Sequence, residues 1–267
     1  MSRFMTYIRF IKKLKQFHKN RNLENVLRED WSSCRELEEF CRDITSITEA
    51  GPEMRFQQKQ AEYLALQNQI NPHFLYNTMD MINWMALQGQ TDEISHAVQS
   101  LSRFYKLTLS RKKGISTIAS ELEHVTIYVQ LQNMRYHDSI ELITDIPDEL
   151  SEYQIPKLTL QPVVENSILH GILEKDSKSG TIVITGWMED ADIVLLISDD
   201  GVGISPEILS TILSGKGNSQ SGGTNIAVYN THRRLQILYG KDYGLAYSSK
   251  PGEGTEVEIR FPAHREE

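Results

Sequence analysis

Residues 181–204 read T-I-V-I-T-G-W-M-E-D-A-D-I-V-L-L-I-S-D-D-G-V-G-I, and this stretch decides the fold of the C-terminal half. It contains two apolar runs of strand length. Similar runs occur at 140–146, 243–249 and 255–261, and two helical segments fall among them, at about 156–173 and 226–239. We therefore predict an α/β sandwich, a sheet with helices packed on it, over residues 137–267.

The N-terminal half has almost no strand signal, because its apolar residues recur every three or four positions. The pattern predicts a first helix at 57–87 and a short turn at 88–91. A second helix follows the turn and ends at about 111, and a third spans 120–135. Ser120 followed by Glu123 fits a capping box at the start of the last helix. The predicted class is thus α + α/β, with a helical signal-input segment at 1–56 and a helical hairpin region at 57–136 ahead of the sandwich.

The composition is that of an ordinary globular protein with an acidic excess. The 267 residues carry a formal net charge of −8, with 39% hydrophobic residues. An acidic chain is a poor partner for a phosphate backbone, so direct nucleic-acid binding is not expected. We interpret Cys34 and Cys41 as buried or idle thiols in a reducing compartment, because a zinc site needs four ligands at short spacings.

No stretch approaches the roughly 20 apolar residues that cross a bilayer, and no secretory signal is visible. We therefore expect this chain to be cytoplasmic. Residues 1–22 nevertheless combine lysines and arginines with apolar side chains and contain no acid. Such a segment fits contact with an anionic membrane surface, or a position after a transmembrane sensor, which would make the complete protein membrane-associated. A solvated helix packed on its neighbour explains it equally well.

Residues 71–77, N-P-H-F-L-Y-N, place a proline immediately before a histidine within a helical pattern. Pro72 provides no amide for the helix ladder, which costs roughly 3 kcal/mol in a helix interior, so we expect a bend there. Asn77 follows His73 by one turn on the same face. A neutral imidazole can attack phosphorus in line, but a structural kink explains the pattern equally well unless the chain also holds a phosphoryl donor.

The segment resembles the phosphoacceptor motif of LytS/YesM-type sensor histidine kinases. The resemblance covers about residues 60–262 and includes L-S-R-F-Y-K, E-L-E-H-V and Y-V-Q-L-Q-N-M-R-Y, at 101–106, 121–125 and 128–136. It implies that His73 accepts phosphate from ATP and that the hairpin region forms a four-helix bundle in a homodimer. Commoner histidine kinases have an acid directly after the histidine, whereas this chain has Phe74, so the general base is not visible beside the nucleophile.

The C-terminal half resembles the ATP-binding domain that histidine kinases share with gyrase, Hsp90 and MutL, the Bergerat-type sandwich. In the first matching element, residues 155–171, the resemblance assigns magnesium binding to Asn166 and a place near the phosphates to His170. An amide oxygen is a suitable hard ligand for Mg²⁺. In the second, D-D-G-V-G-I, it assigns the adenine amino group to Asp199, with Gly201 and Gly203 letting the backbone approach the base.

The third matching element, residues 222–235, follows a stretch rich in Gly, Ser and Asn, 204–224, that we predict to be a mobile lid. Its helix start could hold phosphates through backbone amides. The resemblance assigns ATP-binding roles here and in the last strand to Gly222, Gly223, Asn230 and Thr255. We add Arg234 as a phosphate contact, although an arginine on an amphipathic helix is commonly solvated or salt-bridged.

The chain departs from the family pattern at three positions. Asn225 and Ala227 replace glycines, and Leu169 stands where relatives carry a lysine. These changes support an alternative, a degenerate dimeric scaffold that binds nucleotide without transferring phosphate. A second alternative is a gyrase/Hsp90-like ATPase, but Pro162 stands where such enzymes hold a catalytic Glu.

The resemblance implies a protein-histidine kinase that uses ATP and Mg²⁺. Such an enzyme phosphorylates His73 and then passes the phosphoryl group to an aspartate in the receiver domain of a separate response regulator. Positioning and charge neutralisation supply most of the catalysis of phosphoryl transfer. We interpret Asn77 as a residue that orients water for the reverse, phosphatase, reaction.

Overall fold

The computed structural model describes residues 35, 38–39, 41–42, 72–109, 114–214 and 224–265. The chain divides into two compact units, residues 1–110 and 111–267. Most of the predicted N-terminal segment, including Cys34 and residues 1–22, lies outside the described residues, as do residues 57–71 of the first predicted helix. Cys41 is described and buried, as predicted.

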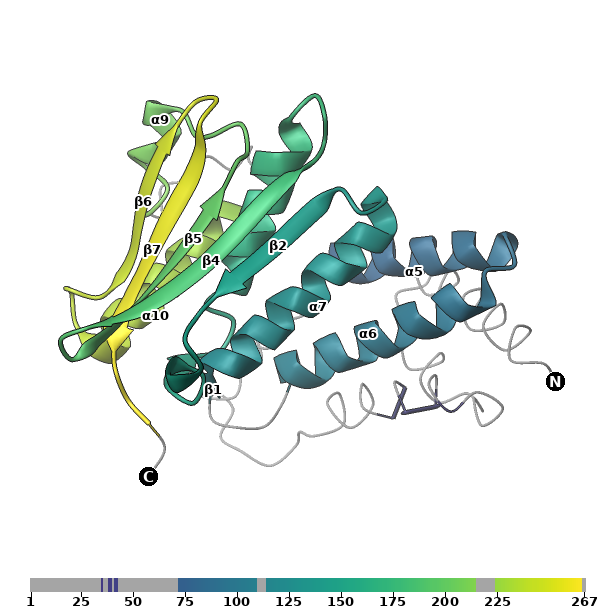
Figure 1. Ribbon diagram of the computed structural model, residues 1–267, viewed down its shortest axis with the longest axis horizontal. Coiled ribbons are helices and arrows are strands. Elements are labelled where there is room, and N and C mark those ends of the chain that lie inside the picture. The colour runs from purple at the N-terminus through teal and green to yellow at the C-terminus, as the bar shows by residue number, and fades with distance from the viewer. Residues whose placement is uncertain are drawn as a thin grey trace, which may run out of the picture. The chain divides into compact units, whose positions relative to one another are not determined.

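Two helices form most of the described part of the first unit: α5, Pro72–Leu87, and α6, Thr91–Leu109 (Figure 1). The turn between them contains Gly89 with a φ of +76°, which glycine adopts without a steric penalty. The helices pack through apolar side chains, and the ring centroids of Phe74 and Phe104 are 5.0 Å apart. The predicted hairpin and its turn are confirmed. The four-helix bundle with a second copy stays a prediction.

The second unit is built on a five-stranded sheet with the strand order β2-β4-β5-β7-β6. β2 and β4 are parallel, and the other neighbours are antiparallel. The strands are β2 Ile140–Asp145, β4 Gly180–Glu189, β5 Asp192–Asp199, β6 Gly244–Lys250 and β7 Gly254–Pro262. All five predicted strands are present, and the pairing of β5 with β7 places Asp199 opposite Thr255.

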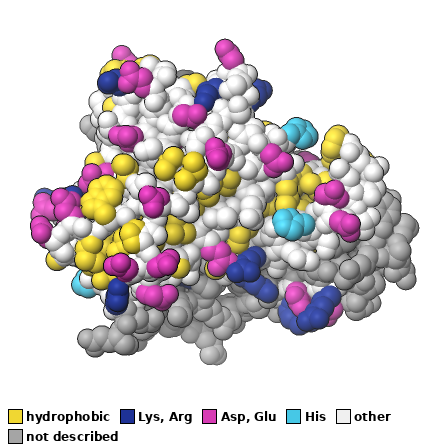
Figure 2. All heavy atoms as spheres, in the orientation of Figure 1, with side chains coloured by type: hydrophobic (Ala, Val, Ile, Leu, Met, Phe, Trp, Pro, Cys, Tyr) yellow, Lys and Arg dark blue, Asp and Glu magenta, His cyan; other side chains and the backbone are white. Residues whose placement is uncertain are grey.

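Helices cover one face of this sheet (Figure 1). They are α7, Ile118–Tyr136, the segment that begins with α8, Gln161–Asn166, and α10, Thr224–Tyr239. The other face carries exposed side chains such as Glu141, Trp187 and Glu256. Figure 2 shows Asp and Glu side chains spread over this face with hydrophobic side chains between them. An antiparallel sheet with one packed and one exposed face produces the alternation from which the strands were predicted.

The predicted helix at 156–173 consists of three shorter pieces. After α8 come a π-helical turn, η2 Ser167–Gly171, and a 3-10 turn, η3 Ile172–Glu174. Four short segments were not predicted: η1 Asp148–Leu150, α9 Pro206–Leu209, which lies within the expected lid, and the strands β1 Ile115–Thr117 and β3 Gln154–Pro156. None of the helices in the described ranges has the length and apolar character that crossing a bilayer requires.

The helix α7 contacts β2 and α8, and the compact units divide between Ser110 and Arg111. The functional grouping of this helix with the hairpin region 57–136 stays a prediction. The predicted capping box at Ser120 is wrong. A two-stranded sheet of β1, Ile115–Thr117, and β3, Gln154–Pro156, keeps Thr117 extended, and its Oγ1 accepts a 3.2 Å hydrogen bond from the Ser120 amide.

Candidate functional site

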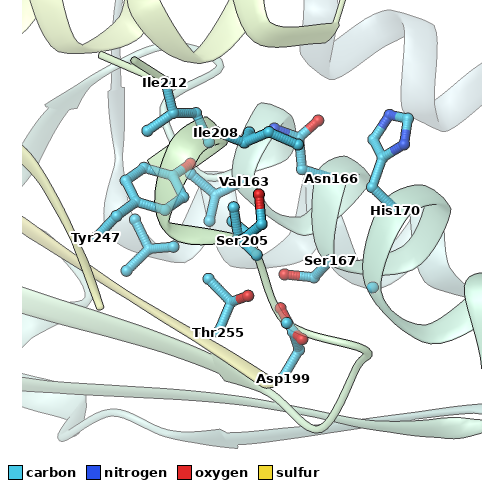
Figure 3. A pocket seen from close by; sticks show the side chains of 14 residues that line it. Val163, Asn166, Ser167, His170, Asp199, Ser205, Ile208, Ile212, Tyr247 and Thr255 are labelled. Carbon is cyan, nitrogen blue, oxygen red and sulfur yellow. The ribbon is translucent and has the colours of Figure 1, made fainter. Parts of the chain in front are cut away.

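Fourteen residues of the second unit line a cavity of about 280 Å³ between α8 with its π-helical turn and strands β5 to β7 (Figure 3). Asp199 and Thr255 lie at one end, where neighbouring strands bring them together. Asn166 and His170 lie at the other end, on the helical segment. The fold therefore brings together residues from every sequence element of the predicted ATP site except the element 222–235.

Asp199 ends β5 with its side chain directed into the protein, and only 8% of the residue is exposed. Its Oδ1 accepts a hydrogen bond of 2.9 Å from the Gly201 amide. Burial raises the pKa of Asp199, while hydrogen bonds from the Ser167 side chain and from the Gly201 and Thr255 amides oppose the shift. A buried carboxylate with a fixed orientation is suited to accept a hydrogen bond from an amino group of a bound ligand.

Close backbone approach explains the glycines that follow Asp199. A Cβ atom on Gly201 would lie 2.5 Å from Cα of Gly171, on the turn that carries His170. Gly203 has a φ of +73°, and a Cβ atom there would collide with the carbonyl oxygen of Lys250. Both positions therefore require glycine for packing of the protein itself. Gly203 also lines the cavity.

The helical end of the cavity presents polar groups. Asn166, half-buried, ends α8, and His170, exposed, lies on the π-helical turn, an element that is frequent at functional sites. Within the ranges that the structure describes, no group of three or more His, Cys, Asp or Glu side chains could hold a metal ion. A cation beside Asn166 would therefore take most of its ligands from water and from the oxygens of a bound molecule, as Mg²⁺ does with phosphates.

Sequence reasoning missed the apolar wall of the cavity, formed by Val163, Ile208, Ile212, Tyr247 and Val257. The Tyr247 hydroxyl is buried without a hydrogen-bond partner among the described residues. Burial raises the pKa of Tyr247, the charge of Asp199 adds to the rise, and the nearby Asn166 side chain opposes it. The alternation along β6 signals that Tyr247 points inward, but it does not reveal which residues lie opposite.

Among the described residues, three that were predicted to bind ATP do not line this cavity: Gly201, Asn230 and Arg234. Nη2 of Arg234 donates to the Leu158 carbonyl at 3.2 Å and to Thr159 Oγ1 at 3.3 Å, and its role toward phosphate stays a prediction. Asn230 is exposed on α10 and does not line the cavity either. Gly222 and Gly223 lie outside the described residues.

The predicted phosphoacceptor lies in the first turn of the described part of α5. His73 is exposed, and Nδ2 of Asn77 lies 3.2 Å from its Nδ1 and 3.3 Å from its Nε2. Phe74 points the other way and is buried at 6% exposure. The residue after the histidine thus anchors α5 to α6 through its ring, while the imidazole faces outward.

Two family models match the chain. The model described as "Histidine kinase" matches residues 61–140, and the model described as "Histidine kinase-, DNA gyrase B-, and HSP90-like ATPase" matches residues 155–265. The chain belongs to the histidine kinase family. The second unit is accordingly an ATP-binding domain of the type shared with gyrase B and HSP90, and the predicted helical region followed by such a sandwich is confirmed.

Named relatives agree with this assignment. The kinase is 34% identical over 223 residues to the sensor histidine kinase YesM of Bacillus subtilis, covering 84% of this chain and 37% of YesM. It is 33% identical over 207 residues to the sensor protein LytS of Oceanobacillus iheyensis, covering 76% and 35% respectively. It thus spans about a third of the length of these relatives. The catalytic domain of histidine kinase ThkA aligns with a TM-score of 0.42 and 15% identity, covering 56% of this chain and 94% of that domain.

Proposed function

We propose that this kinase binds ATP with Mg²⁺ in the cavity, transfers the γ-phosphoryl group to His73 and passes it to an aspartate of a separate response regulator. One observation carries the proposal. The cavity has the buried Asp199 carboxylate at one end and the Asn166 amide at the other, in a chain whose other unit presents an exposed His73.

The residues present fit a nucleotide. At its end of the cavity, the Asp199 carboxylate accepts a hydrogen bond from the adenine amino group. The apolar wall with Val163 and Val257 packs against the base. The Asn166 side-chain oxygen, at the helical end of the cavity, would provide a ligand for Mg²⁺. The metal ion neutralises charge on the phosphate oxygens when it is bound.

In the transfer, a ring nitrogen of His73 forms a bond to the γ-phosphorus. The bond from that phosphorus to the bridging oxygen breaks, and ADP leaves with the electron pair. The side chains contribute mainly by positioning, since a loose transition state requires little covalent assistance. Phe74, the residue next to the nucleophile, cannot act as its base because a phenyl ring has no basic atom, and its ring packs against that of Phe104.

We also propose that the helical hairpin dimerises as a four-helix bundle. Trp84 and Leu87 support this, because they remain 55% and 76% exposed on α5 although the apolar residues that pack on α6 are buried. Burial of such side chains stabilises association. We further propose that residues 1–22 either contact a membrane surface or connect the chain to an upstream sensor.

Incubation of the protein with Mg²⁺ and ATP labelled at the γ-phosphate tests the proposed chemistry. Acid-labile, base-stable label on the protein is expected, with none from ATP labelled at the α-phosphate. Unlabelled protein with released phosphate would instead indicate an ATPase of the gyrase/Hsp90 kind. Bound nucleotide with neither result would indicate a scaffold.

Replacing Asn77 with alanine is expected to slow dephosphorylation of the response regulator on the order of 10-fold to 100-fold, because a misplaced water loses the benefit of orientation. The Asn77 side-chain nitrogen lies 3.2 Å from Nδ1 and 3.3 Å from Nε2 of His73. Asn83→Ala, a half-buried position later in the same helix, is the matched control. Dephosphorylation at the normal rate in Asn77→Ala would remove this role.

A further inference from the structure

A buried carboxylate at the start of α7 holds the chain segment that leads into α8. Glu121 is 3% exposed. Its Oε1 accepts a hydrogen bond of 2.8 Å from the Leu158 amide, and its Oε2 accepts from the amides of Thr159, at 2.8 Å, and Leu160, at 3.2 Å. Three successive backbone amides therefore converge on one side chain that lies almost 40 positions earlier in the chain.

The held segment has a conformation that its residues do not favour on their own. Leu158 has a φ of +56°, in the left-handed region that a branched apolar residue seldom adopts. Thr159 is fully buried, and Leu160 is the N-cap of α8 without a side-chain cap of its own. Amides at a helix start need acceptors, and here the Glu121 carboxylate supplies one from a different element.

Arg234 of α10 completes the cluster from a third element. Its guanidinium donates to the Leu158 carbonyl and to Thr159 Oγ1, so the same two residues are held from both sides. Burial raises the pKa of Glu121, and the three amides and the Arg234 charge oppose the rise. The cluster thus links the starts of α7 and α8 to α10, which follows the predicted lid.

The cavity is lined by residues that follow the segment 158–160 after about one helical turn. Val163, Asn166 and Ser167 follow Leu160 within seven positions, on α8 and the first residue of the π-helical turn. By contrast, the backbones of Asp199 and Thr255 are held by the β5–β7 pairing, whereas the hydrogen bonds described for Glu121 go to residues 158–160. Displacement of the segment 158–160 would therefore move the helical end of the cavity more than the strand backbone at the Asp199 end.

We propose that Glu121 is a positioning residue of the nucleotide site, which sets α8 so that Asn166 and its neighbours meet the metal-bound phosphates. The inference rests on the proposed function for the identity of the ligand. Supporting residues of this kind commonly change metal affinity by about 10-fold to 100-fold when they are replaced.

Glu121→Gln is the informative change. A glutamine keeps the size of the side chain, but its NH₂ group turns one acceptor into a donor that faces backbone amides, and Arg234 loses its counter-charge. We expect MgATP to bind at least about 10-fold more weakly, with ADP binding in the presence of EDTA changed less than about 2-fold. Hydrogen exchange should accelerate in peptides from 158–171 and stay unchanged in peptides from 193–201.

Three further variants complete the experiment. Glu189→Gln is the matched control, because it removes a carboxylate that pairs with Arg260 at the far end of β4. Glu121→Asp keeps the charge on a shorter side chain and should give an intermediate loss of MgATP affinity. If Glu121→Gln does not fold, Glu121→Asp tests the proposal through the same measurements of MgATP affinity, magnesium-free ADP affinity and hydrogen exchange. Asn166→Ala tests the metal ligand of the proposed function directly.

Unchanged exchange in 158–171, or MgATP affinity equal to that of the unaltered protein, would overturn the inference. Equal losses of MgATP and magnesium-free ADP binding would also overturn it, because they indicate general destabilisation. If Asn166→Ala leaves MgATP affinity intact, the metal role in the proposed function fails. In that case a selective loss in Glu121→Gln still supports positioning of α8, so the two failures are distinguishable.

Discussion

A His73→Gln protein is expected to take up no phosphate from ATP while binding MgATP with unchanged affinity. Glutamine fills a similar volume at this exposed position of α5 but has no ring nitrogen to attack phosphorus. Every described residue that lines the cavity belongs to the second unit. Acid-labile label on the protein, measured after incubation with γ-labelled ATP, should therefore fall to background, and calorimetric titration with MgATP should not change.

The matched control for this change is His96→Gln. His96 is also an exposed histidine of the first unit, on α6, and no described contact connects it with the proposed chemistry. It should retain full labelling. Equal labelling of His73→Gln and of the unaltered protein would show that another residue accepts the phosphoryl group.

Replacing Asp199 with asparagine is expected to weaken ATP binding by about 10-fold to 100-fold, the cost of losing a charged hydrogen bond and leaving a buried donor unpaired. The asparagine amide would present its NH₂ group either to the Gly201 amide or to the adenine amino group, and both are donors. Nucleotide titration measures the effect. Autophosphorylation at subsaturating ATP should fall in parallel.

Asp200→Asn provides the comparison for Asp199→Asn. Asp200 is the next residue but is exposed, pairs with Lys175 at 3.0 Å and does not line this cavity. Its replacement should change ATP affinity less than about 2-fold, as is usual for exposed ion pairs. Similar losses in both variants would mean that Asp199 does not contact the base.

The local pattern was enough to predict the sheet, whereas the residues at the Asp199 end of the cavity were predicted from the family resemblance. Alternating apolar residues identify β7 because one face of the sheet is packed and the other is exposed. A strand followed by D-D-G-V-G-I places Asp199 and Gly203 at a strand end by chain connectivity alone. Their roles toward a nucleotide stay predictions.

Contacts between distant segments could not be predicted in the same way. Glu121 and Leu158 are far apart in sequence, and nothing in E-L-E-H-V indicates that the carboxylate accepts from three amides. The contact joins α7 to the segment before α8, and Arg234 donates to the same segment. Tyr247 was missed for a related reason, because its partners across the cavity come from other elements.

Direct identification of the phosphorylated residue tests the central claim. The unaltered protein is incubated with MgATP, digested at mildly alkaline pH, which preserves phosphoramidate bonds, and sequenced by electron-transfer mass spectrometry. We predict that the phosphate lies on His73, in the peptide that contains N-P-H-F-L-Y-N. Phosphate on a different residue, or none in that peptide while the protein binds MgATP, would contradict the account.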